Sequence, residues 1–247
     1  MSDRILVPPT DLMGDGVFET LHLRPAGPWL LDAHLARLAR SAALLDMPPP
    51  VLPDFSELSG EGMVRIIYTR HVLDISVNPL PAGILRERRS GVRVHTADLG
   101  VSVKRPPWSV SAAKTLSYAE NFAARRWAVR QGADDLIWLS TEGYVLEAPT
   151  ASVVWLTGND LCTVPPAAAG ILPGITAAHL LSLAPSVGLH PAERMITRAE
   201  LAAADTIWLA SSLRGLAEVT SLDGVSRARS PWTPRLLDLL GYSTTDA

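Results

Sequence analysis

Lysine is nearly absent from this sequence. The chain has 247 residues and 22 lysines and arginines, of which only Lys104 and Lys114 are lysines. Arginine therefore supplies almost all of the positive charge. A lysine in such a chain can serve a chemistry that arginine cannot, because only an amine readily loses its proton and acts as a nucleophile. The alternative for Lys114 is an ordinary solvated side chain.

Cysteine is also scarce, and the scarcity excludes several classes of protein. The single Cys162 excludes an internal disulfide and a cysteine-rich metal site, and it is typical of a reducing compartment. The six histidines are scattered without the spacing of metal ligands, so we expect no metal. The net charge of -3 provides no basic surface for nucleic acid.

No long apolar run is suited to a membrane. Residues 164–189 carry no charged side chain, but prolines and glycines interrupt them repeatedly, which excludes a continuous lipid-exposed helix. The first twelve residues, MSDRILVPPTDL, have no apolar signal core. We therefore expect a cytoplasmic protein that does not span a membrane.

Strand and helix patterns are mixed without strict βαβ alternation, which predicts an α+β fold in two lobes. Residues 17–23 alternate as a strand after the turn GDG, and Asp32 is the predicted N-cap of a helix that ends near Leu45. The polar, proline-rich stretch KRPPW at 104–108 is the best candidate for a linker. The predicted division is a small domain over 1–106, a linker over 107–112 and a large domain over 113–247.

Lys114 is followed closely by a helix-start signal. Ser117 and Glu120 have the S-x-x-E spacing of a capping box, which predicts a helix from there to about Gln131. Lys114 would then lie about three residues before a helix N-terminus, whose dipole disfavours an ammonium by ~0.3–1 kcal/mol. Burial among the neighbouring small residues acts in the same direction. Both effects favour the neutral amine, the form that makes a Schiff base with an aldehyde.

Other candidate residues follow predicted strands and turns. Glu147 ends a predicted strand at 144–147, where a carboxylate is either solvated or able to keep the nitrogen of a heteroaromatic cofactor protonated. The turn GILPGIT at 170–176 feeds a helix, and the N–H groups of Ile175 and Thr176 suit a phosphate unless the turn is merely structural.

Two further positions have both a functional and a structural interpretation. Ser211 and Ser212 follow the strand TIWLA, where hydroxyls either cap a turn or bind phosphate. Arg37 is either solvated or the cation that a phosphate requires. The arginines at 86, 88 and 89 are interpreted as a solvated surface stretch and receive no role.

Taken in order, six stretches resemble the fold-type IV pyridoxal-phosphate (PLP) family, which includes branched-chain and D-amino-acid aminotransferases and 4-amino-4-deoxychorismate lyase. The stretches are GDGVFET (14–20), HLARLARSA (34–42), AKTLSYAENFAA (113–124), GADDLIWLSTEGYVLE (132–147), ILPGIT (171–176) and SSLRGLAEVTSLDG (211–224). The resemblance covers nearly the whole chain. It implies a small α/β domain, a larger pseudo-barrel α/β domain and a homodimer with each active site at the domain cleft.

The resemblance also implies roles for individual residues. Lys114 would be the catalytic Schiff-base lysine, Glu147 the partner of the pyridine nitrogen, and Leu172 a contact to one face of the PLP ring. The implied phosphate ligands are Arg37, Ile175, Thr176 and Ser212. Leu213 and Arg214 are candidates for binding a substrate carboxylate, through backbone N–H groups or the guanidinium.

The sequence departs from the family at two places. Ser152 stands where many members have an asparagine, so a side-chain amide contact to the substrate is not expected there. The strand pair that precedes GDG in the family is shortened here.

The stretches GDGVFET and KTLSYAENFAARRWAVRQGADD are most similar to the lyase members. The resemblance therefore favours a lyase of the folate pathway that eliminates pyruvate from aminodeoxychorismate and leaves 4-aminobenzoate. The first alternative is an aminotransferase that acts on D-amino acids, branched-chain amino acids or amines with a 2-oxo acid acceptor. The second is a non-catalytic protein with the PLP fold.

Overall fold

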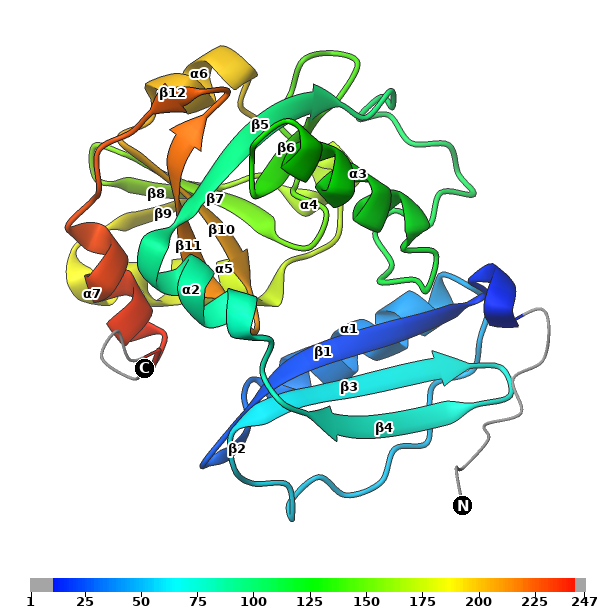
Figure 1. The fold of residues 1–247 in the computed structure, drawn as a ribbon. Helices are drawn as coiled ribbons and strands as arrows, with labels where there is room; N and C mark the ends of the chain where they lie inside the picture. Colours follow the sequence, from blue (N-terminus) through cyan, green and yellow to red (C-terminus); the bar gives the residue numbers. More distant parts are fainter. Residues whose placement is uncertain (1–10, 243–247) are drawn as a thin grey trace. The chain divides into compact units, whose positions relative to one another are not determined.

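The computed structural model of the chain describes residues 11–242, which divide into two compact units (Figure 1). The first unit contains the described residues up to Leu80 together with Val110–Ala119. The second contains Pro81–Ser109 and the described residues from Glu120 onward. The predicted α+β class is confirmed. The shortened strand pair expected before GDG falls largely on residues 1–10, outside the described part.

The observed division differs from the predicted boundaries at 106 and 113. Strand β5 (Val92–Asp98) pairs in parallel with β6 (Asp135–Leu139) and β11 (Gly215–Leu222), so it belongs to the second unit. Lys114, expected in the large domain, instead belongs to the first unit. Parallel pairing between segments more than 40 residues apart leaves no local signal in the sequence.

The first unit is an antiparallel sheet with one long helix against it. Strand order is β2-β1-β3-β4, and α1 lies along one face of the sheet (Figure 1). The elements are the 3-10 turn η1 (Asp11–Met13), β1 (Gly16–Arg24), β2 (Gly27–Pro28), α1 (Leu31–Ala43), β3 (Gly62–Thr69) and β4 (Leu73–Asn78). Residues 53–58, between α1 and β3, form no helix or strand, only a turn.

Strand β1 forms as predicted and provides the core of this unit, but it is buried on both faces, with only Thr20 and Arg24 partly exposed. Val17, Leu21 and Leu23 are buried with Leu38 and Ala42 of α1. The apolar residues on one face of β1 therefore meet an apolar helix stripe, and Glu19 is the one polar residue between them on that face.

The start of α1 differs from the prediction. Its N-cap is Leu30, at φ 54°, and Asp32 lies within the first turn instead of capping it. An aspartate in the first turn still interacts favourably with the helix dipole.

The second unit is built on an eight-stranded sheet, and none of the helices within residues 11–242 is long and apolar enough to cross a membrane. Strand order is β6-β5-β11-β10-β7-β8-β9, with β12 on β11. The remaining strands are β7 (Ser152–Thr157), β8 (Asp160–Thr163), β9 (His190–Glu193), β10 (Thr206–Ser211) and β12 (Val225–Ser226). The helices are α2 (Ala82–Ser90), α3 (Ala119–Arg130), α4 (Pro166–Ala169), α5 (Ile175–Leu183), η2 (Ala184–Val187), α6 (Arg198–Ala203) and α7 (Trp232–Leu239).

Two local predictions in the second unit have different outcomes. The T-x-x-E spacing of Thr197 and Glu200 predicts a helix start, and the two residues form a reciprocal capping box at the start of α6. The strand expected at 144–147 is reduced to isolated bridges, one from Tyr144 to Thr197 and one from Val145 to Leu139. Glu147 therefore leaves this short bridged segment instead of ending a regular strand.

Candidate active site

Lys114 is fixed to the edge of β1 by its own backbone. Its carbonyl accepts a hydrogen bond from the N–H of Phe18 at 2.9 Å, and the next residue, Thr115, forms an antiparallel bridge with Val17. The N–H of Lys114 donates to Ser41 Oγ on α1 at 3.1 Å. The lysine is thus held between a strand and a helix of the first unit, with its side chain half-buried.

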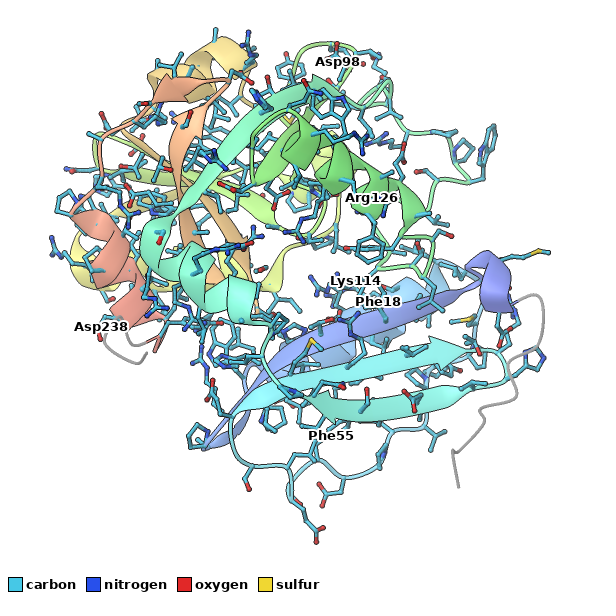
Figure 2. All side chains as sticks on the ribbon, in the orientation of Figure 1. Phe18, Phe55, Asp98, Lys114, Arg126 and Asp238 are labelled. Carbon is cyan, nitrogen blue, oxygen red and sulfur yellow. The ribbon has the colours of Figure 1, made fainter. Side chains whose placement is uncertain are left out.

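The amine of Lys114 lies among aromatic groups. Nζ is 3.3 Å from the hydroxyl of Tyr118 and 4.4 Å from the ring centroid of Phe18 (Figure 2). The two rings pack edge to face with centroids 5.0 Å apart. The position of Tyr118 was not singled out from the sequence, although its place four residues after the lysine is a usable signal.

The helix after Lys114 starts later than predicted. Helix α3 begins at Ala119, five residues beyond the lysine, and Ser117 Oγ donates to the carbonyl of Gly14 at 3.4 Å. The capping box predicted at Ser117 is therefore wrong. A helix dipole acts within about one turn of its end, so the sequence argument from the dipole of α3 does not apply to Lys114.

Arg65 lies half-buried beside Phe18, and no signal in the sequence singled it out. Its guanidinium lies 5.2 Å from the centroid of Phe18, and Nη2 is 3.6 Å from Met63 Sδ. Burial lowers the pKa of Arg65. Within residues 11–242 this guanidinium has no carboxylate partner.

Arg37 is buried in a cluster with Glu19 and His34. Its Nε donates to Glu19 Oε1 at 2.6 Å and its Nη2 to Oε2 at 2.9 Å, while His34 Nδ1 lies 2.7 Å from Oε2. Burial by itself would raise the pKa of Glu19, but the charge and hydrogen bonds of Arg37 and His34 outweigh it and lower that pKa from 4.5 to about 2. Burial also lowers the pKa of His34, which favours the neutral ring.

These contacts exclude the interpretation of Arg37 as a solvated side chain. The guanidinium carries five N–H donors, of which two serve Glu19 in the bonds just given. Ser41, one helical turn after Arg37, holds the backbone of Lys114. The first unit thus connects Arg37 and Lys114 through one helix.

In the second unit, Glu147 and Leu172 are neighbours, as their expected roles around one ring require. The N–H of Leu172 donates to Glu147 Oε1 at 3.4 Å, and the carbonyl of Glu147 accepts from the N–H of Trp138 at 2.9 Å. The carboxylate is half-buried, and this contact orients it toward the segment that leads into α5.

The start of α5 presents polar groups without protein partners. Gly174 is its N-cap and offers no side-chain cap, so the first-turn N–H groups of Ile175 and Thr176 remain at the helix end. Thr176 Oγ1 is buried and has no hydrogen-bond partner within residues 11–242. A buried hydroxyl beside a helix N-terminus suits an anion such as a phosphate.

Ser152 marks the place where these elements meet. A Cβ at Gly174 would lie 2.0 Å from Ser152 Oγ, so only glycine permits this approach. Ser152 is also paired with Ala210 of β10, one residue before that strand ends at Ser211. Glu147, Leu172, the start of α5 and Ser212 are therefore gathered at one end of β7 and β10.

The substrate role considered for the Arg214 guanidinium is wrong. Arg214 is only 1% exposed, with Nε 2.8 Å from Glu87 Oε2 and Nη2 3.1 Å from Asp135 Oδ2. A guanidinium enclosed by two carboxylates is committed to the fold. The backbone alternative remains, since the N–H groups of Leu213 and Arg214 have no partner within the described residues.

Arg88 was interpreted as a solvated residue, and this is also wrong. It is buried and donates to the carbonyls of Leu213 at 2.8 Å and Arg214 at 3.2 Å. Only tertiary contacts distinguish it from its exposed neighbours Arg86 and Arg89.

Comparison with known proteins agrees with the family resemblance of the sequence. The family model described as Amino-transferase class IV matches residues 16–222. A Mycobacterium tuberculosis protein named bifunctional aminodeoxychorismate lyase / D-amino acid transaminase is 39% identical to this chain. The match covers 88% of this chain and 85% of that protein. The aminodeoxychorismate lyase of Bacillus subtilis is 26% identical, with 87% of this chain and 80% of that protein covered.

The similarity extends to three dimensions. A solved structure described as a hypothetical aminotransferase from Mycobacterium tuberculosis in its PLP-bound form superposes with a TM-score of 0.90 at 37% identity, covering 98% of this chain and 94% of that one. The family model spans most of the chain, and the Mycobacterium tuberculosis relative is 39% identical over 88% of it. The chain belongs to the class IV aminotransferase family.

Proposed function

We propose that the chain is a PLP-dependent 4-amino-4-deoxychorismate lyase, which forms pyruvate and 4-aminobenzoate, a folate precursor. The observation that carries this proposal is the 39% identity, over 88% of the chain, to the Mycobacterium tuberculosis protein whose name includes this activity. The same name includes D-amino acid transamination, which supports that reaction as a second activity of this chain.

The residues present fit PLP. The first turn of α5 supports phosphate binding, because Thr176 Oγ1 is buried there without a protein partner. Ile175, Ser212 and Arg37 are the other proposed phosphate ligands. The carboxylate of Glu147 is proposed to keep the pyridine nitrogen protonated, and Leu172, whose N–H contacts that carboxylate, to pack on the ring.

When bound, PLP supplies an electron sink that stabilises negative charge on the substrate. Lys114 Nζ, as a neutral amine, takes a proton from the substrate and later returns one. The hydroxyl of Tyr118, 3.3 Å from Nζ, restrains the amine between these two transfers.

The lyase reaction balances without an oxidant. The bond between a ring carbon and the enolpyruvyl oxygen breaks, the ring loses a proton, and the leaving group takes one up to become pyruvate. Aromatisation of the ring drives the step. In transamination Lys114 would move the proton taken from the amino donor, and the donor would leave as a 2-oxo acid once its amino group has passed to the 2-oxo acid acceptor.

The deciding assay offers both kinds of substrate to the same preparation. Aminodeoxychorismate should yield 4-aminobenzoate and pyruvate in equal amounts, and D-alanine with 2-oxoglutarate should yield pyruvate more slowly. Turnover only with amino donors such as D-alanine, L-leucine or an aromatic amine contradicts the lyase proposal. Failure to bind added PLP, seen as no new absorbance band, indicates a non-catalytic protein.

The two lysines provide a matched pair of variants. Lys114→Ala should lower the rate by about 10²–10⁴-fold, since it removes the proposed base. Lys104→Ala, which leaves that base in place, should keep the wild-type rate. Borohydride treatment of the PLP-loaded protein should attach a pyridoxyl group to the peptide with Lys114 and leave the one with Lys104 unmodified.

We also propose a cytoplasmic homodimer. Helix α3 supports an interface between copies, because Phe122 (51% exposed), Trp127 (39%) and Val129 (63%) leave apolar surface on it. Light scattering on the purified protein should give twice the chain mass of 26.5 kDa. A mass of one chain at micromolar concentration contradicts this proposal.

A further inference from the structure

The turn between β10 and β11 is held from one side along its whole length. It consists of Ser212, Leu213 and Arg214, and the pair Ser211–Gly215 closes it. Gly215 has φ +63°, a left-handed conformation that glycine adopts without strain. No regular strand pairing fixes the three turn residues, so their orientation depends on other contacts.

Those contacts come from two distant parts of the chain. Arg88 of α2 donates from Nη2 to the carbonyl of Leu213 at 2.8 Å and from Nε to that of Arg214 at 3.2 Å. The hydroxyl of Tyr242, beyond α7, donates to the carbonyl of Ser212. All three consecutive carbonyl oxygens of the turn are therefore bound by two side chains.

The two side chains also support each other. Arg88 Cζ lies 4.5 Å from the centroid of the Tyr242 ring, and Tyr242 is 2% exposed. A Cβ at Gly215 would lie 2.9 Å from that ring, so glycine is required for the ring to approach the turn. A buried cation stacked on an aromatic ring keeps its donors in a fixed orientation.

Helix α2 reaches the turn through a second contact. Glu87, next to Arg88, lies 2.8 Å from the guanidinium of Arg214, which also contacts Asp135. Helix α2 thus binds both the side chain of Arg214, through Glu87, and its carbonyl, through Arg88.

The consequence concerns the opposite side of the turn. In a planar trans peptide the carbonyl and the following N–H point in opposite directions. The bonds to Arg88 and Tyr242 therefore direct the N–H groups of Leu213 and Arg214 away from both side chains. These two N–H groups have no partner within the described residues, so they are available to an anion.

We propose that Arg88 and Tyr242 are positioning residues, which hold the turn Ser212–Arg214 so that it presents Ser212 and the N–H groups of Leu213 and Arg214 to anionic ligands. This inference rests on the proposed function, in which Ser212 binds the cofactor phosphate and the N–H groups bind a substrate carboxylate. Neither Arg88 nor Tyr242 contacts the ligand in this arrangement. They act through the backbone that does.

The test compares PLP with pyridoxal, which lacks the phosphate. Tryptophan fluorescence of the apoenzyme gives the dissociation constant of each compound for wild type, Tyr242→Phe, Arg88→Lys and the exposed control Arg86→Lys. We expect the ratio of the pyridoxal to the PLP constant to fall about five- to tenfold in Tyr242→Phe and Arg88→Lys, and to stay at the wild-type value in the control. A merely structural effect would weaken both compounds alike.

Kinetics on the loaded enzyme provide the second readout. In Tyr242→Phe, the KM for D-alanine and 2-oxoglutarate should rise about five- to tenfold while kcat changes less than threefold. An unchanged ratio of constants together with an unchanged KM overturns the inference. A wild-type protein that binds neither PLP nor pyridoxal instead overturns the proposed function, so the two failures are distinguishable.

Discussion

Each unit of the molecule buries an arginine against carboxylates, and the two clusters are built differently. In the first unit, Arg37 donates twice to Glu19, which it shares with a histidine of the same helix. In the second, Arg214 lies between Glu87 and Asp135, and Asp135 is fully buried. One carboxylate thus serves two nitrogen groups in the first cluster, whereas in the second two carboxylates enclose the buried Arg214, with the partly exposed Arg125 on their outer side.

We propose that this difference separates an arginine that binds an anion, Arg37, from one that maintains the fold, Arg214. Burial does not make this distinction, since both guanidinium groups are nearly inaccessible. The number of carboxylates does, because a second carboxylate around Arg214 repels an incoming anion. We therefore expect changes at Arg37 to act on ligand binding and changes at Arg214 to act on stability.

The largest expected effect is on stability. Arg214→Met removes the guanidinium between two buried carboxylates and should lower the free energy of unfolding by about 3–5 kcal/mol, the usual effect of breaking a buried ion pair. Urea denaturation followed by tryptophan fluorescence measures it. The exposed Arg40→Met is the control and should stay within about 0.5 kcal/mol of wild type. A loss below about 1 kcal/mol would mean that the second cluster contributes no more than a surface ion pair.

Acid should weaken the first cluster next. The pKa of Glu19 is about 2 in the folded state and near 4.5 otherwise, so its contribution is complete above pH 4.5 and is lost as the pH falls toward 2. The whole contribution is about 3 kcal/mol. The stability difference between wild type and Glu19→Gln should therefore shrink by about 2 kcal/mol between pH 6 and pH 3. A difference that is constant with pH would show that Glu19 titrates normally in the folded state.

A smaller effect is expected on cofactor affinity. Arg37→Lys keeps the charge, but a single ammonium cannot hold Glu19 and a phosphate with separate nitrogens, so PLP should bind about tenfold more weakly, or ~1.4 kcal/mol. Pyridoxal binding should change little. Equilibrium titration of the apoenzyme checks both, with Arg40→Lys on the same helix as control. Equal losses for the two compounds would argue that Arg37 supports the fold instead of the phosphate.

The smallest expected effect is at the outer side of the second cluster. Arg125 lies 3.6 Å from Glu87 and 3.8 Å from Asp135, and a third of its side chain is exposed. Arg125→Gln should cost at most about 1 kcal/mol in urea denaturation, because partly exposed ion pairs are weak. A loss as large as that of Arg214→Met would mean that the two arginines share the neutralisation of these carboxylates equally.

Local signals in the sequence predicted some parts of the molecule, although the S-x-x-E spacing at Ser117 caps no helix. The spacing of Thr197 and Glu200 located a capping box that the structure contains. Alternation along residues 17–23 predicted the strand β1, but not that both of its faces are buried. Each of these signals lies within a few residues, where backbone geometry and side-chain type are directly linked.

Features that depend on distant partners were not predictable in this way. Arg88 and Arg86 have the same side chain and lie on one helix, yet only Arg88 meets carbonyl groups from residues more than 120 positions later. Likewise, nothing in the pattern of β5 reveals that its neighbours are β6 and β11. A single sequence indicates which residues can be buried, but the topology of the fold determines which distant residue each of them contacts.

The assignment of Val110–Ala119 to the first unit affects how the protein is made. During synthesis, β1 to β4 leave the ribosome well before the segment that carries Lys114, although that segment bridges β1 at Val17. Domains fold as units while the chain grows. The first unit therefore completes its edge only after a piece of the second has already been synthesised, and Lys114 is among the last of its residues to be placed.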